Sequence, residues 1–245
     1  MSDAWQAFAD AIAARRDAGR ETVFWWRDDD AAACTPELEQ LLSVSYRAAV
    51  PLAVAVIPEP ADAALFGLLR AGVYVLQHGT DHRNRAAAGE KKTEFPASEP
   101  EAEALERLRR GRLRLERLAG GRALPVLAPP WNRLRPELAA SLPAAGISGL
   151  SKYRTRAAQP PAAGVTQVDT HVDVVAWRAG RGFIGEAAAL ALAARHFAHE
   201  DGPIGWLTHH AVHGREVMDF LTRLFDESRR AGARWASAPE LWRAA

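Results

Sequence analysis

The chain has 245 residues, 48% of them hydrophobic, so it is long enough to bury a sizeable core as one domain. Its 31 Lys and Arg residues nearly balance its 30 Asp and Glu residues. The resulting net charge of +1 disfavours a nucleic-acid partner or a membrane surface, since both usually require a basic face. The single cysteine, Cys34, excludes an internal disulfide and a cysteine-rich zinc site, and we expect it to be a small buried residue.

The N-terminal segment predicts an amphipathic helix over residues 3–18. It does not show the basic start, apolar stretch and cleavage site of an export signal. No apolar run reaches the roughly 18 residues that a membrane span requires. These features lead us to expect a cytoplasmic protein.

Strand-like and helix-like segments alternate along the rest of the chain. Apolar strands are expected over 22–26, 52–57, 73–76, 124–127, 147–150, 165–168, 172–176 and 204–208. Helices are expected from Pro36 towards Tyr46, over 61–70, for about 20 residues up to Gly120, and over 136–145, 186–199 and 215–230. Thr35 before Pro36 is typical of a helix start, and Ser237 with Glu240 resembles a capping box that opens a last short helix.

This alternation predicts a mainly parallel sheet with helical crossovers. No glycine-rich phosphate loop follows the first strand, which disfavours a dinucleotide-binding sheet. In a barrel, catalytic groups collect at the C-terminal ends of the strands. The acidic triplet, two histidine clusters and a Pro-Pro-Trp loop of this chain all follow predicted strands. We therefore expect an α/β barrel.

The triplet Asp28-Asp29-Asp30 follows the first predicted strand. Three adjacent carboxylates repel one another and raise their own pKa values unless a positive group lies among them, and a metal ion is the usual one. The alternative is an acidic turn that caps the next helix, with Asp30 as its N-cap residue.

The segment His78-Gly79-Thr80-Asp81-His82 follows another predicted strand. Two imidazoles four residues apart can bind one metal if the turn between them is tight. His209 and His213 repeat the spacing, but the long polar loop over 78–99 favours the first pair as functional. Two histidines and one carboxylate leave positions open for water and substrate, which is typical of a catalytic metal site.

Two further motifs lie at strand ends. His209 and His210 follow the strand over 204–208, where a histidine can act as a general acid, although a surface pair is the simpler interpretation. In the loop from Ala128 to Trp131, two prolines fix the backbone. The Trp131 N–H could then serve as an oxyanion donor while its ring walls the site, or the loop could be only a rigid apolar turn.

The order of these motifs resembles the polysaccharide deacetylase superfamily (carbohydrate esterase family 4, the chitooligosaccharide-deacetylase homology domain) over about residues 20–215. The signatures of that family are an Asp-Asp pair, His-Ser/Thr-x-x-His, Arg-x-Pro, Asp-x-x-Asp-Trp and a late Leu-x-His. The corresponding segments here are Asp29-Asp30, His78 to His82, Ala128 to Trp131, Asp173 to Trp177, and Leu207 to His209. The resemblance implies a distorted (β/α)7-type barrel, with residues 1–245 as a single catalytic domain whose core spans about 20–235.

The resemblance also implies site roles. The implied metal ligands are Asp30, His78 and His82. Asp29 would be the general base, although the third aspartate allows Asp28 and Asp29 to hold the base and ligand roles instead. The implied ion is a divalent metal, zinc in the first place, with cobalt, iron, nickel and manganese as alternatives.

On the same resemblance, the Trp131 N–H would help to hold the oxyanion. His209 would be the acid, with His210 as the alternative because strand alternation turns only one of them inward. Two departures stand out. Gly79 replaces the Ser or Thr of the family, and Ala128 stands where the arginine of the family would orient the base, so that Arg27 or Lys91 would have to assist Asp29.

The implied activity is removal of an acyl group from an N-acylated sugar or a related small amide by attack of metal-bound water. One alternative is hydrolysis of a cyclic amide or ureide on the same fold. The other is a non-catalytic relative that binds a carbohydrate or metabolite, which the missing arginine favours. The expected partner is a small-molecule or oligosaccharide substrate, and a homo-oligomer stays open.

Overall fold

The computed structural model describes residues 3–154, 162–197 and 202–242. Its α-helices are α1 (Asp3–Asp17), α2 (Pro36–Ala48), α3 (Ala63–Gly67), α4 (Glu101–Ala119), α5 (Pro136–Ser141), α6 (Glu186–Phe197), α7 (Arg215–Ala231) and α8 (Ala238–Trp242). Its strands are β1 (Val23–Ala31), β2 (Leu52–Val56), β3 (Val73–His78), β4 (Ala123–Ala128), β5 (Gly149–Leu150), β6 (Thr166–Gln167), β7 (Thr170–Asp173), β8 (Ile204–Thr208) and β9 (Arg234–Trp235).

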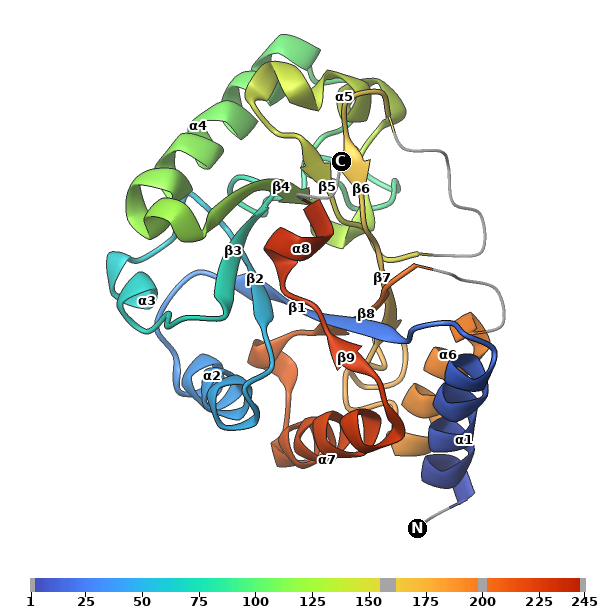
Figure 1. Ribbon diagram of the computed structural model, residues 1–245. Coiled ribbons are helices and arrows are strands. Elements are labelled where there is room, and N and C mark those ends of the chain that lie inside the picture. The colour runs from blue at the N-terminus through green and yellow to red at the C-terminus, as the bar shows by residue number, and fades with distance from the viewer. Residues whose placement is uncertain (1–2, 155–161, 198–201, 243–245) are drawn as a thin grey trace.

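The strands form one sheet in the order β6-β5-β4-β3-β2-β1-β8-β7, with β9 added beside β1. Every strand pair named here is parallel. A bridge between Tyr153, just after β5, and Thr170 in β7 brings the two ends of the sheet together. Helices α1 to α7 lie around the outside of this curled sheet (Figure 1). The expected distorted (β/α)-type barrel in a single domain is confirmed.

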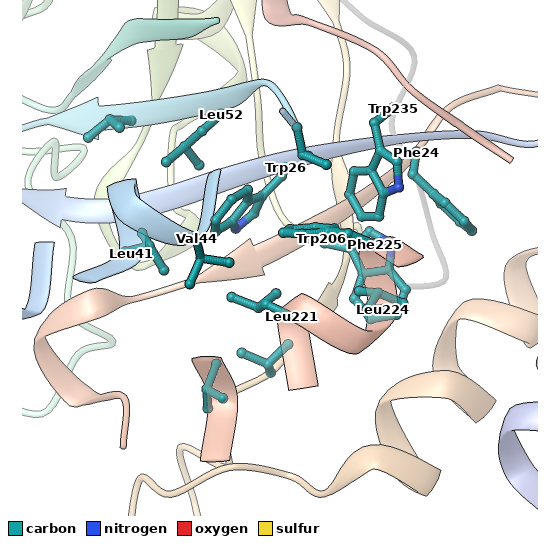
Figure 2. Close-up of a cluster of buried hydrophobic side chains, with 14 of the residues drawn as sticks. Phe24, Trp26, Leu41, Val44, Leu52, Trp206, Leu221, Leu224, Phe225 and Trp235 are labelled. Atoms are coloured by element: carbon teal, nitrogen blue, oxygen red, sulfur yellow. The ribbon is translucent and has the colours of Figure 1, made fainter. Parts of the chain in front are cut away.

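The main core lies between the sheet and the surrounding helices. Phe24 and Trp26 alternate with Trp25 along β1, so they point outward from the barrel while Trp25 points inward. Figure 2 shows Trp26 near Trp206 and Phe225, between the strands and α7. Burying each of these side chains stabilises the fold by roughly 1.5–3 kcal/mol. The buried face of α7 repeats at helical spacing: Val217, Phe220, Leu221, Leu224, Phe225 and Ser228.

The barrel interior contains a smaller cluster that includes Trp25, Ala53, Ala55, Leu76, Val126 and Ala128. Helix α8 closes this interior at the end where the strands begin. The Trp242 ring packs edge-on against Trp25 at 5.4 Å, and its Nε1 donates to the Thr166 carbonyl at 3.1 Å. Figure 1 shows α8 over the middle of the curled sheet. The functional side chains must therefore lie at the opposite end, where the strands finish.

Several local predictions hold. Thr35 caps α2 through its Oγ1, which accepts from the Leu38 N–H at 3.2 Å, and Pro36 is the first helical residue. The capping box before α8 forms, because the Glu240 carboxylate accepts from the Ser237 backbone N–H at 2.7 Å. The loop after His78 contains no helix or strand before α4 begins at Glu101.

Other expectations are wrong. The strand expected to stop at Trp26 continues as β1 to Ala31, so the acidic triplet lies within a strand and not in a turn after it. Cys34 is exposed, with its thiol 3.1 Å from a Glu39 carboxylate oxygen, because it lies in the open connection to α2 and not in the core. Within the described ranges, no helix has both the length and the apolar character to cross a membrane.

Candidate metal centre and active site

The acidic triplet is distributed by the geometry of β1. Arg27 and Asp29 fall on the inward face with Trp25, whereas Asp28 falls on the opposite face. Alternation alone would place Asp30 beside Asp28. However, Asp30 has a φ of 72°, and the pairing with β2 is irregular between Asp28 and Ala31. Such irregularities re-aim side chains near functional sites, and this one turns Asp30 towards the end of β3.

The Asp30 carboxylate contacts both His78 and His82. Its Oδ1 lies 3.0 Å from His78 Nε2 and 3.3 Å from His82 Nε2. One ligand atom from each residue lies within 4.8 Å of the other two, which is close enough for a single ion. The Asp30 side chain is 33% exposed and that of His82 is 25% exposed, so water and an ion can reach the group.

The imidazole of His78 is oriented by a backbone carbonyl on the side away from Asp30. Its Nδ1 lies 2.9 Å from the Ala128 carbonyl oxygen, at the end of the neighbouring strand β4. This contact fixes the proton on Nδ1 and leaves Nε2 free to face Asp30, an arrangement that metal-ligating histidines commonly show. Two histidines and a carboxylate with open positions fit zinc and the other borderline divalent metals.

The charges within this group are strongly coupled. Burial alone would raise the pKa of Asp30, but hydrogen bonds from His78 and His82 hold it far below its usual range. Burial opposes protonation of His78, yet the charge of Asp29 and the contact with Asp30 raise its pKa above the ordinary value. The Asp30 carboxylate therefore lies among groups that favour its charged form, which suits a ligand of a cation.

The turn between the two histidines is held by Glu94, a fully buried residue of the long loop. Its Oε1 accepts from the Thr80 N–H at 2.8 Å, from the Asp81 N–H at 3.1 Å, and also from the Thr80 hydroxyl. A Cβ at Gly79 would lie 1.9 Å from Glu94 Oε2 and 2.7 Å from the Pro130 ring. Gly79 therefore stands where the family has Ser or Thr because a carboxylate occupies the space of the side chain.

Asp29 lies beside the metal-ligating group and is only 4% exposed. Its Oδ2 accepts a hydrogen bond from Arg27 Nη2 at 2.9 Å, and its Oδ1 makes an ion-pair contact with Arg27 Nε at 2.8 Å. On the other side, His209 Nε2 lies 4.0 Å from Asp29 Oδ2. A carboxylate and an imidazole thus face each other at the end of β1 and β8.

His209 also contacts the segment from Asp173 to Trp177, which corresponds to the Asp-x-x-Asp-Trp signature. Its Nδ1 lies 3.9 Å from Asp173 Oδ1, and the Trp177 ring packs edge-on against the imidazole at 4.7 Å. Trp177 Nε1 donates to Asp173 Oδ2 at 2.7 Å, which ties the two residues together. Burial raises the pKa of Asp173, although the charge of His209 and the Trp177 hydrogen bond partly offset that effect. The stretched spacing of this motif nevertheless places both residues against His209.

His210 has a different partner. Its Nδ1 lies 2.5 Å from Asp28 Oδ2, and its backbone N–H donates to Asp28 Oδ1 at 3.0 Å. The Thr208 hydroxyl donates to the same Oδ1 at 2.7 Å. Burial would raise the pKa of the Asp28 carboxyl, but His210 lowers it. Asp28 therefore anchors the segment that carries His209, and it lies with His210 rather than with His78 and His82.

Trp131 lies against the candidate metal ligands. Its ring is 4.5 Å from the His82 ring, and it has a left-handed backbone with a φ of 53°. The next residue, Asn132, exchanges two hydrogen bonds with the Tyr153 backbone, at 2.6 and 2.8 Å. The Pro-Pro-Trp loop is thus fixed at both ends beside the site, with the indole forming one wall.

The structure brings the sequence-predicted ligands Asp30, His78 and His82 together, with Asp29 and His209 next to them. Sequence reasoning did not find Glu94, nor Ser151, whose hydroxyl accepts from Arg27 Nη1 at 2.6 Å, because neither stands in a recognisable motif. It named Arg27 only as one of two residues that could assist Asp29. The i, i+2 spacing of Arg27 and Asp29 would have favoured Arg27, had β1 been extended through the triplet.

Neither the known protein-family models nor the curated proteins match this sequence. Solved structures do match the fold. The Bc1960 peptidoglycan N-acetylglucosamine deacetylase shares 15% identity at a TM-score of 0.58, over 92% of this chain and 90% of that chain. A family 4 acetyl xylan esterase from Clostridium thermocellum, in complex with a cobalt ion, shares 14% identity at a TM-score of 0.57, over 91% of each chain.

A third structure is BA3943, a CE4 family pseudoenzyme from Bacillus anthracis. It shares 13% identity at a TM-score of 0.59, over 91% of this chain and 66% of that chain. At such identities the likeness establishes architecture and not activity. The chain has the fold of the polysaccharide deacetylases of carbohydrate esterase family 4.

Proposed function

We propose that the protein is a metal-dependent hydrolase that removes an acyl group from an N-acylated sugar or a related small amide. The observation that carries this proposal is the convergence of Asp30, His78 and His82 on one point beside Asp29 and His209. A ligand set with open positions, a carboxylate base and an imidazole acid are the groups that amide hydrolysis requires.

A divalent ion held by Asp30, His78 and His82 would polarise the amide carbonyl and lower the pKa of water. The other steps belong to the side chains around it. Asp29 accepts the proton of the attacking water, because its carboxylate lies next to the candidate ligands and is held in place by Arg27. His209 then donates a proton to the leaving nitrogen.

Asp173 and Trp177 orient His209 for that proton transfer, since the imidazole is bounded by both. The 44% exposed Trp177 ring and the Trp131 ring line the approach to the site. Flat apolar rings next to polar groups suit a sugar, which has both apolar faces and hydroxyl groups. The Trp131 backbone N–H is our candidate donor to the oxyanion.

The fold alone does not separate an enzyme from a pseudoenzyme, because BA3943 shares it. What favours an enzyme here is that Asp29 and His209 stand together beside a complete ligand set. A protein that only binds carbohydrate would not need a carboxylate and an imidazole placed beside a set of candidate metal ligands.

The metal assignment is tested by elemental analysis of protein purified without chelators. We expect about one divalent ion per wild-type chain and loss of both ion and activity in Asp30→Asn and His78→Ala. Asn tolerates the positive φ of residue 30, so that variant removes a charged ligand without a backbone penalty. The affinity should fall by more than the ~10–100-fold that loss of a supporting residue costs.

His171→Asn is the matched control, because His171 is a buried histidine that contacts the Gly205 N–H and the His196 ring instead of the ligand set. It should retain the metal. Normal metal content in both ligand variants would overturn the assignment. Release of acid from N-acetylated sugars and small acetamides, measured against ring opening of allantoin-like ureides, then tests the reaction itself.

A further inference from the structure

We propose that Arg27 is the positioning residue of Asp29 and replaces, from β1, the arginine that the family resemblance expects at the position of Ala128. This inference rests on the proposed function, because it presumes that Asp29 is the base. It identifies the residue that positions Asp29 in a chain that has Ala128 in place of the arginine of the family.

The first observation is burial. Arg27 is 3% exposed and Asp29 is 4% exposed, so each charge depends on the other for compensation. The two residues are separated by one position along a strand, which places both side chains on the inward face. The guanidinium approaches both carboxylate oxygens, at 2.9 Å for Oδ2 and 2.8 Å for Oδ1. The hydrogen bond from Nη2 to Oδ2, together with the close ion-pair contact at Oδ1, holds the carboxylate against the guanidinium.

The second observation is that the other side of the guanidinium is hydrogen-bonded to Ser151. Arg27 Nη1 donates to the Ser151 hydroxyl at 2.6 Å and to the Ser151 carbonyl at 3.0 Å. Ser151 is fully buried and follows β5, and its N–H donates to the Leu127 carbonyl in β4 at 2.8 Å. The guanidinium therefore spans the barrel from β1 to the strand ends next to Ala128.

The third observation is the space that the side chain occupies. Inward positions near Arg27 are small, with Ala53 paired to Arg27 in the sheet and Ala128 at the end of β4. A long side chain at position 128 and another at position 27 would compete for the same region by Ser151. The alanine at 128 and the arginine at 27 are thus complementary, which accounts for the departure from the family pattern at Ala128.

A direct consequence concerns His209, whose Nε2 lies 4.0 Å from the same Asp29 oxygen that accepts from Arg27. If the guanidinium were absent, this carboxylate would be free to turn towards the imidazole or towards the ligand set. Arg27 keeps it between them. Arg27 itself does not touch the reacting atoms.

The activity test compares Arg27→Met, Arg27→Lys and the double variant Arg27→Met/Ala128→Arg in metal-loaded protein, with an N-acetylated sugar as substrate. We expect Arg27→Met to lower kcat by about 10–100-fold with KM and metal content nearly unchanged, because misplacing a base by about 1 Å costs up to ~100-fold. Arg27→Lys should recover part of kcat, and an arginine at position 128 should recover more.

Arg15→Met is the matched control. Arg15 is also a buried arginine, 6% exposed, and donates to the Phe197 carbonyl at 2.7 Å in another part of the fold. Its loss should lower the melting temperature without changing kcat. A wild-type kcat in Arg27→Met would overturn the proposal. Equal losses of kcat in Arg27→Met and Arg15→Met would also overturn it.

A second measurement does not need turnover. Arg27→Met leaves the buried Asp29 charge without its partner, so its melting temperature should fall, and adding Asp29→Asn should restore much of the loss. Additive losses in this cycle would refute the pairing. If Arg27→Met alone does not fold, the pairing predicts that Arg27→Met/Asp29→Asn folds, and failure of both variants to fold would refute it. If the wild type binds metal yet releases acid from no N-acyl substrate, the proposed function fails while the cycle still decides the pair.

Discussion

Gly79 shows how a missing side chain can shape the candidate metal site. The space of its Cβ is filled by a Glu94 oxygen at 1.9 Å and by the Pro130 ring at 2.7 Å, and its φ is 61°. The buried Glu94 carboxylate in turn holds the turn that leads from His78 to His82. A residue on the loop far from the histidines along the chain thereby sets the distance between two ligands.

We predict that Gly79→Ala lowers stability by about 2–4 kcal/mol, because overpacking and a strained positive φ each cost about 1–3 kcal/mol. It should also weaken metal binding, since Glu94 must move and His82 with it. Thermal unfolding and metal titration measure the two effects.

Gly89→Ala separates the two causes. Gly89 also has a positive φ, 85°, but a Cβ there would meet nothing within 4 Å. It should show only the smaller backbone cost and keep wild-type metal affinity. Equal metal affinity in both glycine variants would mean that Glu94 does not set the ligand geometry.

At the scale of the strand, β1 explains why three adjacent aspartates can be tolerated. Each carboxylate has its own cation or donor group: His210 and Thr208 for Asp28, Arg27 for Asp29, and the two histidines for Asp30. Repulsion within the triplet predicted a nearby positive group, and that inference was sound. It did not predict that the strand runs through the triplet, because aspartate is disfavoured in strands and the partners come from distant segments.

The neighbouring aspartates should therefore give different phenotypes. We predict that Asp28→Asn keeps the metal but loses about 1–3 kcal/mol of stability, since an amide cannot satisfy all the donors that now surround the buried carboxylate. Its kcat should fall because the segment carrying His209 loses its anchor.

Metal analysis and kinetics of Asp28→Asn beside Asp30→Asn provide the comparison. Only Asp30→Asn should lose the ion. Loss of the metal in Asp28→Asn would contradict this assignment. If Asp29→Asn loses the metal and Asp30→Asn keeps it, then Asp29 is the ligand and Asp28 the base, one residue earlier along β1.

For the whole molecule, alternation of apolar strands with amphipathic helices was sufficient to predict the parallel sheet and its helical shell. Long elements such as α4 and α7 were also found close to their true limits. The short strands between Gly146 and Asp173 were less predictable. β5 and β6 contain two residues each, and the bridge from Tyr153 to Thr170 depends on the curl of the whole sheet and not on local sequence.

The same long-range dependence affects the site. His78 and His82 were predictable as a pair because both follow one strand. The placement of Ser151 beside Arg27 was not, since it requires β5 to close towards β1 across the barrel. The candidate ligands could thus be named from the sequence, whereas the groups that hold the base could not.

Stability of the whole fold should depend on pH through His171. Burial, with the charges of His196 and Arg154, lowers the pKa of His171 to about 3, and its Nδ1 accepts from the Gly205 N–H at 3.0 Å. The unfolded chain titrates near 6.5 and so binds the proton first as the pH falls. Stability is complete above about 6.5 and declines towards 3, with a slope of up to ~1.4 kcal/mol per pH unit from this residue.

Denaturant unfolding of wild type and His171→Asn between pH 7 and pH 4 measures this slope. The variant cannot titrate, so its stability should depend less on pH in that interval, whatever its absolute value. Parallel curves would show that His171 is not the responsible group.

The plug formed by α8 determines how molecules reach the candidate site. Trp25 and Trp242 seal one end of the barrel, and Asp30, His78 and His209 lie at the other. Among the described residues, these two rings lie across the barrel axis at that end. Under the proposed function, substrate would then enter and product would leave through the same end of the barrel, the one at which the strands finish.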